Sequence, residues 1–111
     1  MAEKKAPPST VAKVRDVFTK FGELSDKVVF GDVWERKELS KRDRSLVTIS
    51  ALTAMGKPDQ LYGHLIRALD NGVTKQEIIE VITHLAFYSG WPNAGSAAVV
   101  AKEVFKERGS Q

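Results

Sequence analysis

A capping motif near residue 74 constrains the fold of this chain more than any other feature. Thr74 and Glu77 form a T-x-x-E box, in which each side chain accepts a hydrogen bond from a backbone N–H at the start of a helix. Gly90 ends the helix, because glycine readily takes the conformation that follows a helix and Pro92 cannot continue it. The pattern therefore predicts a helix from residue 75 to residue 88 or 89.

Similar signals divide the middle of the chain. Ser40 with Asp43 three residues later resembles a capping box, and Gly56 marks the end of the segment that it begins. The β-branched run at 47–49 would also suit a strand, but the caps and the length favour a helix. A second helix is expected to begin near Pro58 and to end at Gly72, with apolar residues at 61, 65, 68 and 69 on one face.

The two ends of the chain carry weaker signals. Ser9 or Thr10 can cap an amphipathic helix with apolar residues at 11, 14, 18 and 21, and residues 24–30 either extend it past a bend or form a separate segment. Asn93 is expected to cap a final helix, whose small residues would let a neighbouring helix approach closely. We predict a flexible tail at 1–8, a single domain at 9–108, and an all-α fold of five to six helices.

Composition excludes several classes of protein. The chain has no cysteine, which rules out disulfides, thiolate catalysis, iron–sulfur clusters and zinc fingers. Its net charge of +3 arises from lysines and arginines interleaved with acidic residues, which favours a solvated surface over a nucleic-acid-binding stripe. No apolar run approaches the roughly 18 residues of a membrane span, and the first ten residues lack the apolar region of a signal peptide. We expect a cytoplasmic protein that binds neither nucleic acid nor membranes.

Glu80 and His84 lie one turn apart on the helix that follows Thr74. Their polar arc can simply face solvent, together with Tyr88. However, the end of this arc is aromatic, which leaves a covered face as the alternative. In a covered site the carboxylate would raise the pKa of the imidazole, and the pair would form a proton-transfer unit. Trp91 follows this arc and adds to its aromatic end.

Three further residues are candidates for a ligand site. His64 is either an ordinary helical histidine or a partner of Glu80 and His84, which an antiparallel helix pair would bring closer. Arg44, near the positive end of its helix, is a surface charge or an anion anchor, and Trp34 is an apolar anchor or a pocket wall. A metal site is not favoured, because the histidines do not form an H-E-x-x-H pattern and no second cluster of ligands exists.

Two long stretches of the sequence, VWERKELSKRDRSLVTISAL and LYGHLIRALDNGVTKQEIIEVITHLAFYSGWPNAGSA, resemble the carboxymuconolactone decarboxylase family over about residues 30–100. The resemblance implies an alkylhydroperoxidase-D-like helical fold, assembled as a homo-hexamer from dimers. It also implies a catalytic site of His64, Glu80 and His84 near a subunit interface. Arg44, Trp34, Tyr88 and Trp91 match motif positions and are expected to bind substrate.

The wider superfamily contains thiol peroxidases, whose catalytic cysteines correspond to Lys57 and Gln60 here and whose glutamate corresponds to Ser45. The resemblance therefore leaves the decarboxylase branch. It implies cofactor-independent conversion of 4-carboxymuconolactone to 3-oxoadipate enol-lactone, in the catabolism of protocatechuate. Two alternatives stay open, namely an enzyme acting on another lactone or β-keto acid, and a non-catalytic binding or stress-associated oligomer that keeps the fold.

Overall fold

A computed structural model of the chain describes residues 9–109, and the predicted tail at 1–8 lies outside them. The described residues contain no strand, so the all-α prediction is confirmed. The α-helices are α1 (Thr10–Val14), α2 (Thr19–Leu24), α3 (Lys41–Ala54), α4 (Pro58–Asp70), α5 (Lys75–Ser89) and α6 (Trp91–Arg108). A π-helical segment, η1 (Ser25–Phe30), and a 3-10 turn, η2 (Val33–Glu35), lie between α2 and α3. Of these helices, none has the length and apolar character needed to cross a membrane.

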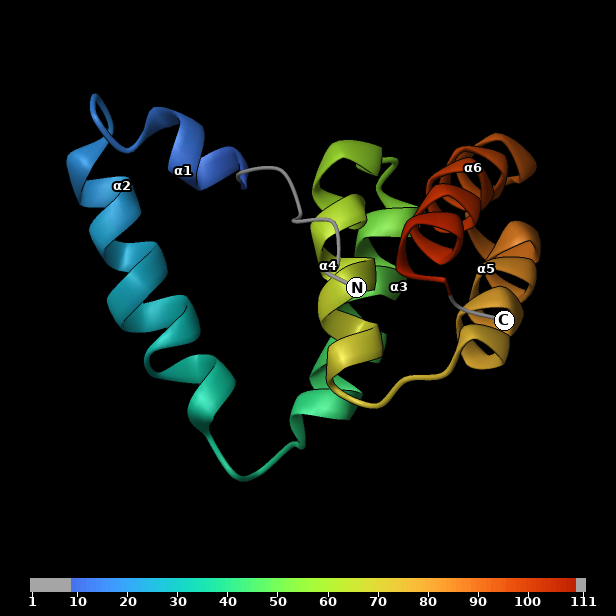
Figure 1. Cartoon of the computed structure of the whole chain (residues 1–111), viewed down its shortest axis with the longest axis horizontal. Coiled ribbons are helices and arrows are strands. Elements are labelled where there is room, and N and C mark those ends of the chain that lie inside the picture. The colour runs from blue at the N-terminus through green and yellow to red at the C-terminus, as the bar shows by residue number, and fades with distance from the viewer. Residues whose placement is uncertain (1–8, 110–111) are drawn as a thin grey trace.

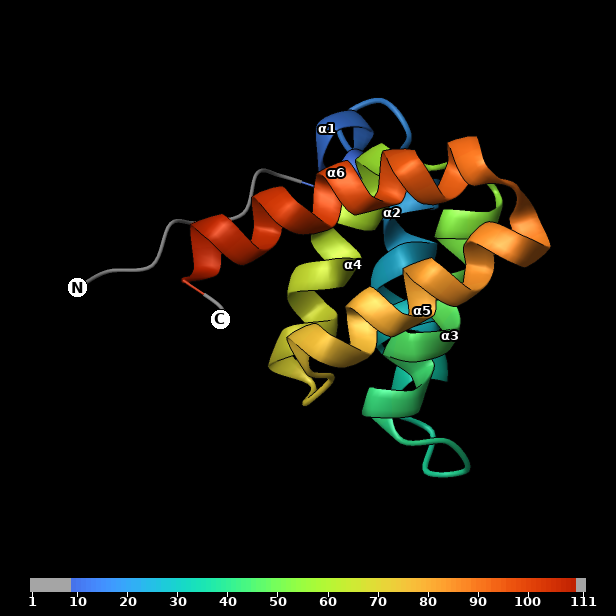
Figure 2. The same ribbon diagram turned by 90° about the vertical axis from the view of Figure 1, so that its right-hand side faces the viewer.

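Helices α3 to α6 form a bundle that contains almost all of the buried apolar residues (Figures 1 and 2). Helix α5 packs mainly against α6 and α3, while α4 packs against α3 and α6. Small residues on α6 permit this close packing, as the sequence predicted. The core consists of Ile49, Leu61, Leu65, Ala68, Val73, Ile78, Ile82, Ala94, Ala97, Ala101, Val104 and Phe105.

Local capping explains where the bundle helices begin. The Ser40 hydroxyl accepts from the Asp43 N–H at 3.0 Å, and both hydrogen bonds of the Thr74–Glu77 box form, which confirms these two predicted starts. The predicted cap at Asn93 is wrong, because α6 begins two residues earlier with a proline in its first turn. The Asn93 amide instead donates to the carbonyls of Ala54 and Ser89, so it joins the ends of α3 and α5.

Residues 10–35 form an arm that stands apart from the bundle (Figure 1). The single amphipathic helix predicted here is broken at residues 15–18, where the chain turns between α1 and α2. Arg15 stabilises this turn by donating to both carboxylate oxygens of Asp26 and to the Gly22 carbonyl. A Cβ on Gly22 would lie 2.9 Å from Cγ of Arg15, so this close approach requires glycine.

The arm meets the bundle at two places. Near one end, the Gln60 amide of α4 donates to the Thr10 hydroxyl at 3.1 Å. Near the other end, Trp34 of η2 is only 8% exposed. It is the one buried side chain with a large apolar surface between residues 9 and 40, since Gly22 is the other buried residue there. The arm therefore runs alongside α4 and contacts the bundle mainly near its two ends, at Thr10 and at Trp34.

Candidate active site

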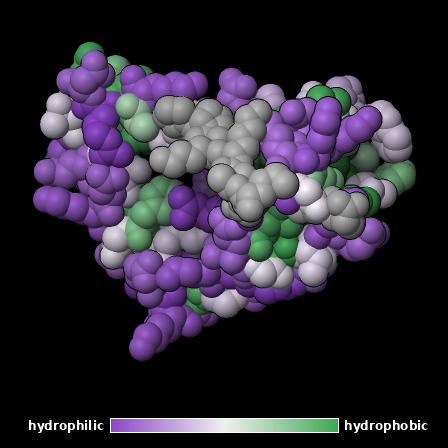
Figure 3. All heavy atoms as spheres, viewed as in Figure 1, coloured by the Kyte–Doolittle hydropathy of each residue, from purple (hydrophilic) through white to green (hydrophobic). Residues whose placement is uncertain are grey.

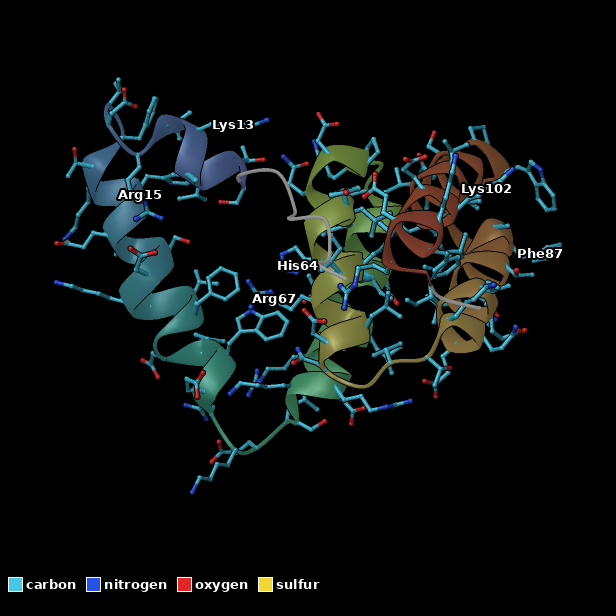
Figure 4. All side chains as sticks on the ribbon, viewed as in Figure 1. Lys13, Arg15, His64, Arg67, Phe87 and Lys102 are labelled. Atoms are coloured by element: carbon cyan, nitrogen blue, oxygen red, sulfur yellow. The ribbon has the colours of Figure 1, made fainter. Side chains whose placement is uncertain are left out.

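A cleft of about 1020 Å³ lies between the arm and α4. Its polar walls include Lys13 and Arg15 from the arm and Tyr62, His64 and Arg67 from α4. Figure 4 shows His64 and Arg67 reaching from α4 toward the arm, and this face of the molecule is mostly hydrophilic in Figure 3. The cleft is large enough for a small-molecule ligand, because such pockets typically measure about 300–1,000 Å³.

Three residues of the cleft wall, Phe30, His64 and Arg67, form a cluster with Trp34, which packs on Phe30 and His64 but does not itself line the cleft; we call these four residues the aromatic cluster. The Phe30 and Trp34 rings stack with centroids 5.8 Å apart. The His64 ring stacks against both, with centroid distances of 6.4 Å to Phe30 and 6.0 Å to Trp34. The two arm residues therefore fix the imidazole plane from the side opposite its own helix. Of the two roles considered for Trp34 from the sequence, its position matches the apolar anchor, since it is buried and does not itself line the cleft.

The imidazole of His64 is sheltered and has unused hydrogen-bonding capacity. Its Nδ1 is buried without a hydrogen-bond partner, and no hydrogen bond among residues 9–109 engages Nε2. Burial lowers the pKa of His64 below its ordinary value of 6.5, and the positive charge of Arg67 lowers it further. The ring is therefore neutral at neutral pH. A neutral imidazole carries one donor and one acceptor, which suits it to proton transfer.

Glu80 and His84 lie elsewhere in the molecule. Both side chains are exposed on α5, and within residues 9–109 no hydrogen bond or ion pair joins them. The His84 ring stacks on Tyr88 at 4.8 Å between centroids. The structure does not bring this pair to His64, because α5 packs against α3 and α6, on the side of the bundle away from the arm (Figure 2).

The aromatic residues near Glu80 and His84 are also open to solvent. Tyr88 is 77% exposed and Trp91 is 68% exposed, and Trp91 makes an edge-to-face contact with Phe87 at 5.9 Å. Figure 4 shows Phe87 pointing outward from α5, on the side opposite the labelled His64. In a single chain this group forms an exposed aromatic surface, which is the uncovered alternative considered from the sequence.

Arg44 is engaged in local structure. Its guanidinium donates to the backbone carbonyls of Leu39 at 3.1 Å and Arg36 at 3.2 Å, and thereby closes the loop that precedes α3. It does not line the cleft. Ser45, at the position of the superfamily's glutamate, is buried and accepts a hydrogen bond from the Asn71 amide. Within the described range, no three His, Asp or Glu side chains are grouped so that they could hold a metal ion.

Two residues of the aromatic cluster were missed in the sequence. Arg67 follows His64 by three residues, so a helical wheel would have placed both on one face. Phe30 was recognised only as part of an apolar segment, and no local pattern shows that it contacts α4. Its place depends on the path of the arm, which is a tertiary feature.

Comparison with known proteins places the chain in a family. Residues 19–103 match the model of the carboxymuconolactone decarboxylase family. The chain is 39% identical to a 4-carboxymuconolactone decarboxylase of Acinetobacter baylyi over 100 residues, which cover 90% of this chain and 75% of that protein. It is 34% identical to the nitrosuccinic acid decarboxylase npaB of Metarhizium robertsii over 91 residues, covering 81% of this chain and 64% of the relative.

A third relative is an uncharacterized 15.0 kDa protein from the nqo9-nqo10 intergenic region of Paracoccus denitrificans. It is 35% identical over 80 residues, covering 70% of this chain and 60% of that protein. The chain thus spans three quarters of the first relative and less than two thirds of the other two. The match over residues 19–103, together with the Acinetobacter relative, shows that this chain belongs to the carboxymuconolactone decarboxylase family and is by class a carboxy-lyase.

Proposed function

We propose that this protein decarboxylates 4-carboxymuconolactone, or a related lactone carboxylate, to the enol-lactone of 3-oxoadipate. The name of the Acinetobacter relative supports this substrate. The structural observation that carries the proposal is the sheltered, neutral imidazole of His64, which lies in a ligand-sized cleft beside a cation. Such an arrangement is suited to an anionic substrate whose reaction requires movement of a proton.

The reaction needs little from the protein beyond binding and proton transfer. The bond between the ring carbon and the leaving carboxylate breaks, and its electron pair moves through the ring alkene to the lactone carbonyl. The resulting dienolate takes one proton at the ring carbon next to that carbonyl, which gives the enol-lactone and carbon dioxide. The substrate is its own electron sink, so the protein must supply a cation for the remaining carboxylate, a donor for the enolate oxygen, and an acid.

His64 is proposed to serve the developing enolate. A neutral imidazole can donate a hydrogen bond to the lactone oxygen without the cost of burying an uncompensated positive charge. An incoming anionic substrate raises the pKa of this ring, because a nearby negative charge favours the protonated form. His64 is therefore able both to stabilise the dienolate and to deliver the proton.

Glu80 and His84 are proposed as a second proton-transfer pair that works in an assembled protein. Their surroundings are apolar and exposed, which is typical of a surface that a second subunit covers. The arm exposes further large apolar residues, among them Phe18, Phe21, Leu24, Val28 and Val29. We expect a homo-oligomer, and the family resemblance favours a hexamer built from dimers. Sedimentation as a monomer at micromolar concentration would contradict a site that needs a second copy.

A direct assay tests the proposed activity. Purified protein is mixed with freshly generated 4-carboxymuconolactone, and the ultraviolet absorbance of substrate and product is followed. Removing the proton-transfer group in His64→Gln is expected to lower the rate about a hundredfold or more. A full rate in His64→Gln excludes the cleft as the site, and full rates in both His84→Ala and Glu80→Gln exclude that pair. If a correctly assembled wild-type protein shows no turnover, the non-catalytic alternative is favoured.

The Metarhizium relative supports a second candidate substrate class. Its name describes decarboxylation of nitrosuccinic acid. In that compound the electron pair left by carbon dioxide can move into the nitro group, so the substrate is again its own electron sink. Both substrates keep one carboxylate after the other has left. The same absorbance assay with nitrosuccinate distinguishes a lactone-specific protein from one that accepts carboxylates activated in other ways.

A further inference from the structure

Arg67 carries a charge that the described protein leaves uncompensated. Its Cζ lies 4.4 Å from the centroid of the Phe30 ring and 5.5 Å from that of Trp34. These cation–π contacts use the faces of the planar guanidinium. Within residues 9–109 the Arg67 side chain makes no hydrogen bond and no ion pair. Its N–H donors, which lie along the edges of the plane, are therefore available to a ligand.

The other cations on the cleft wall are Arg15 and Lys13, and among residues 9–109 the Lys13 ammonium likewise makes no ion pair. Arg15 is held by both carboxylate oxygens of Asp26. Asp70 lies three residues after Arg67, but it accepts from Arg108 of α6 at 2.6 Å. Asp59, the remaining carboxylate on the cleft wall, lies eight residues before Arg67, which is about 12 Å along α4. The nearest carboxylate on the same helix is thus directed elsewhere, and the cleft keeps a net attraction for anions around Arg67.

The spacing of Arg67 from His64 matches the shape of a lactone with an acetate arm. Residues three apart on a helix have Cβ atoms about 5–6 Å from each other. A carboxylate bound side-on to the guanidinium places a ring, one methylene away, over the neighbouring turn, where the imidazole of His64 lies. The rings of Phe30 and Trp34 stack near both side chains and fix their relative orientation.

We propose that Arg67 is the residue that binds the carboxylate retained by the substrate, through a side-on pair of hydrogen bonds in the cleft between the arm and α4. The proposal deepens and rests on the proposed function, since it concerns the same site. It takes the role of anion anchor from Arg44, whose guanidinium already donates to two backbone carbonyls. It also predicts that monocarboxylates lacking the retained group are poor ligands.

Binding of an unreactive probe tests this assignment separately from catalysis. The probe is muconolactone, which has the ring and the acetate arm but carries hydrogen in place of the leaving carboxylate. Its dissociation constant is measured by calorimetry for wild type, Arg67→Gln, Arg67→Lys and Lys102→Gln. Lys102, on α6 and outside the cleft, gives the control for loss of one positive charge (Figure 4). Circular dichroism checks that each variant is folded.

Loss of a charge-assisted hydrogen-bonding pair is expected to weaken binding about 10- to 100-fold in Arg67→Gln. Arg67→Lys should recover part of the affinity, because lysine keeps the charge but lacks the planar fork. Lys102→Gln should bind within about threefold of wild type. Equal affinity of Arg67→Gln and wild type would overturn the assignment, as would an equal loss in Lys102→Gln. Probe binding without decarboxylation by the wild type would overturn the proposed function and leave the anion site standing.

Discussion

Replacing Trp34 by alanine should detach the arm and leave the bundle folded. Trp34 is the main apolar contact of the arm, since no other large side chain between residues 9 and 40 is buried. A buried tryptophan removes about 150–250 Å² from water, which is worth roughly 4–6 kcal/mol at about 25 cal/mol per Å². Alanine keeps part of this area and the unfolded chain already buries some, so the expected loss is about 3–5 kcal/mol.

Native-state hydrogen exchange can locate this loss. At 1.4 kcal/mol per factor of ten, amides of α2 and η1 should exchange roughly 100- to 3,000-fold faster in Trp34→Ala, or lose protection entirely if the arm is less stable than that. Leu65 and Val104 are completely buried in the core, and the backbone amides near them should keep their protection from exchange. Both proteins are compared at a concentration where they sediment alike, so that assembly does not differ between them.

Trp91→Ala is the matched control, because it makes the same chemical change at a side chain that is 68% exposed. It should leave exchange in the arm unchanged. Equal acceleration of arm and bundle amides in Trp34→Ala would show that the tryptophan supports the whole core. Unchanged exchange in the arm would show that other contacts hold it. Either result would refute the claim that Trp34 is the main contact holding the arm against the bundle.

Three further predictions concern titration and capping. Because the pKa of His64 is lowered in the folded state, the unfolded chain binds more protons than the folded chain as the pH falls through 6.5. The free energy of unfolding should therefore decrease in this pH range. An equal decrease of the free energy of unfolding with pH in His64→Gln would contradict this. The hydrogen bond to Glu107 raises the pKa of Tyr62 to about 12. This hydrogen bond therefore contributes to the free energy of unfolding below pH 10, and the contribution is lost between pH 10 and 12. In denaturation experiments, the free energy of unfolding of Tyr62→Phe should therefore decrease less between pH 10 and 12 than that of the wild type. Thr74→Ala should lower the free energy of unfolding in urea by about 1 kcal/mol, whereas Thr83→Ala, in mid-helix, should change it by less than about 0.5 kcal/mol.

The helices of the bundle could be predicted from the sequence because their ends are set by local chemistry. Ser40, Thr74 and Gly90 act within one turn of their own position, so short motifs are sufficient to locate them. The arm was harder, because its break after α1 depends on Arg15 reaching across to Asp26. That contact joins residues 11 apart in sequence and has no periodic signature.

Burial within α3 shows a different limit. The apolar residues of the sequence would place Val47 and Met55 on its buried side together with Leu46, Ile49 and Leu52, but Val47 and Met55 are 61% and 60% exposed, while Ser45 and Thr53 are buried. Hydrophobic periodicity placed Leu46, Ile49 and Leu52 correctly but not the edges of the buried face, because two small polar residues occupy part of the core side of this helix. Ser45 is accommodated there by the hydrogen bond from Asn71.

Only part of the candidate site could be predicted from the sequence, and its arrangement could not. His64 and Trp34 were both chosen from the sequence, and the structure brings them into contact. His64 was also expected near Glu80 and His84, because α4 and α5 were treated as an antiparallel pair. The turn between them instead directs α5 onto α3 and α6. Two helices joined by a short turn therefore need not pack against each other, because the packing of the whole bundle decides which helices are in contact.

The location of the site between two differently stabilised parts links ligand binding to the arm. His64 and Arg67 belong to α4 in the bundle, whereas the rings that orient them belong to the arm. A ligand that binds only when these rings are in place stabilises the attached arm, by about 2.7 kcal/mol at 100 times its dissociation constant. This energy is somewhat smaller than the roughly 3–5 kcal/mol that Trp34 itself is expected to contribute. Ligand binding and attachment of the arm should therefore stabilise each other, because both depend on the contacts that Phe30 and Trp34 make with His64 and Arg67.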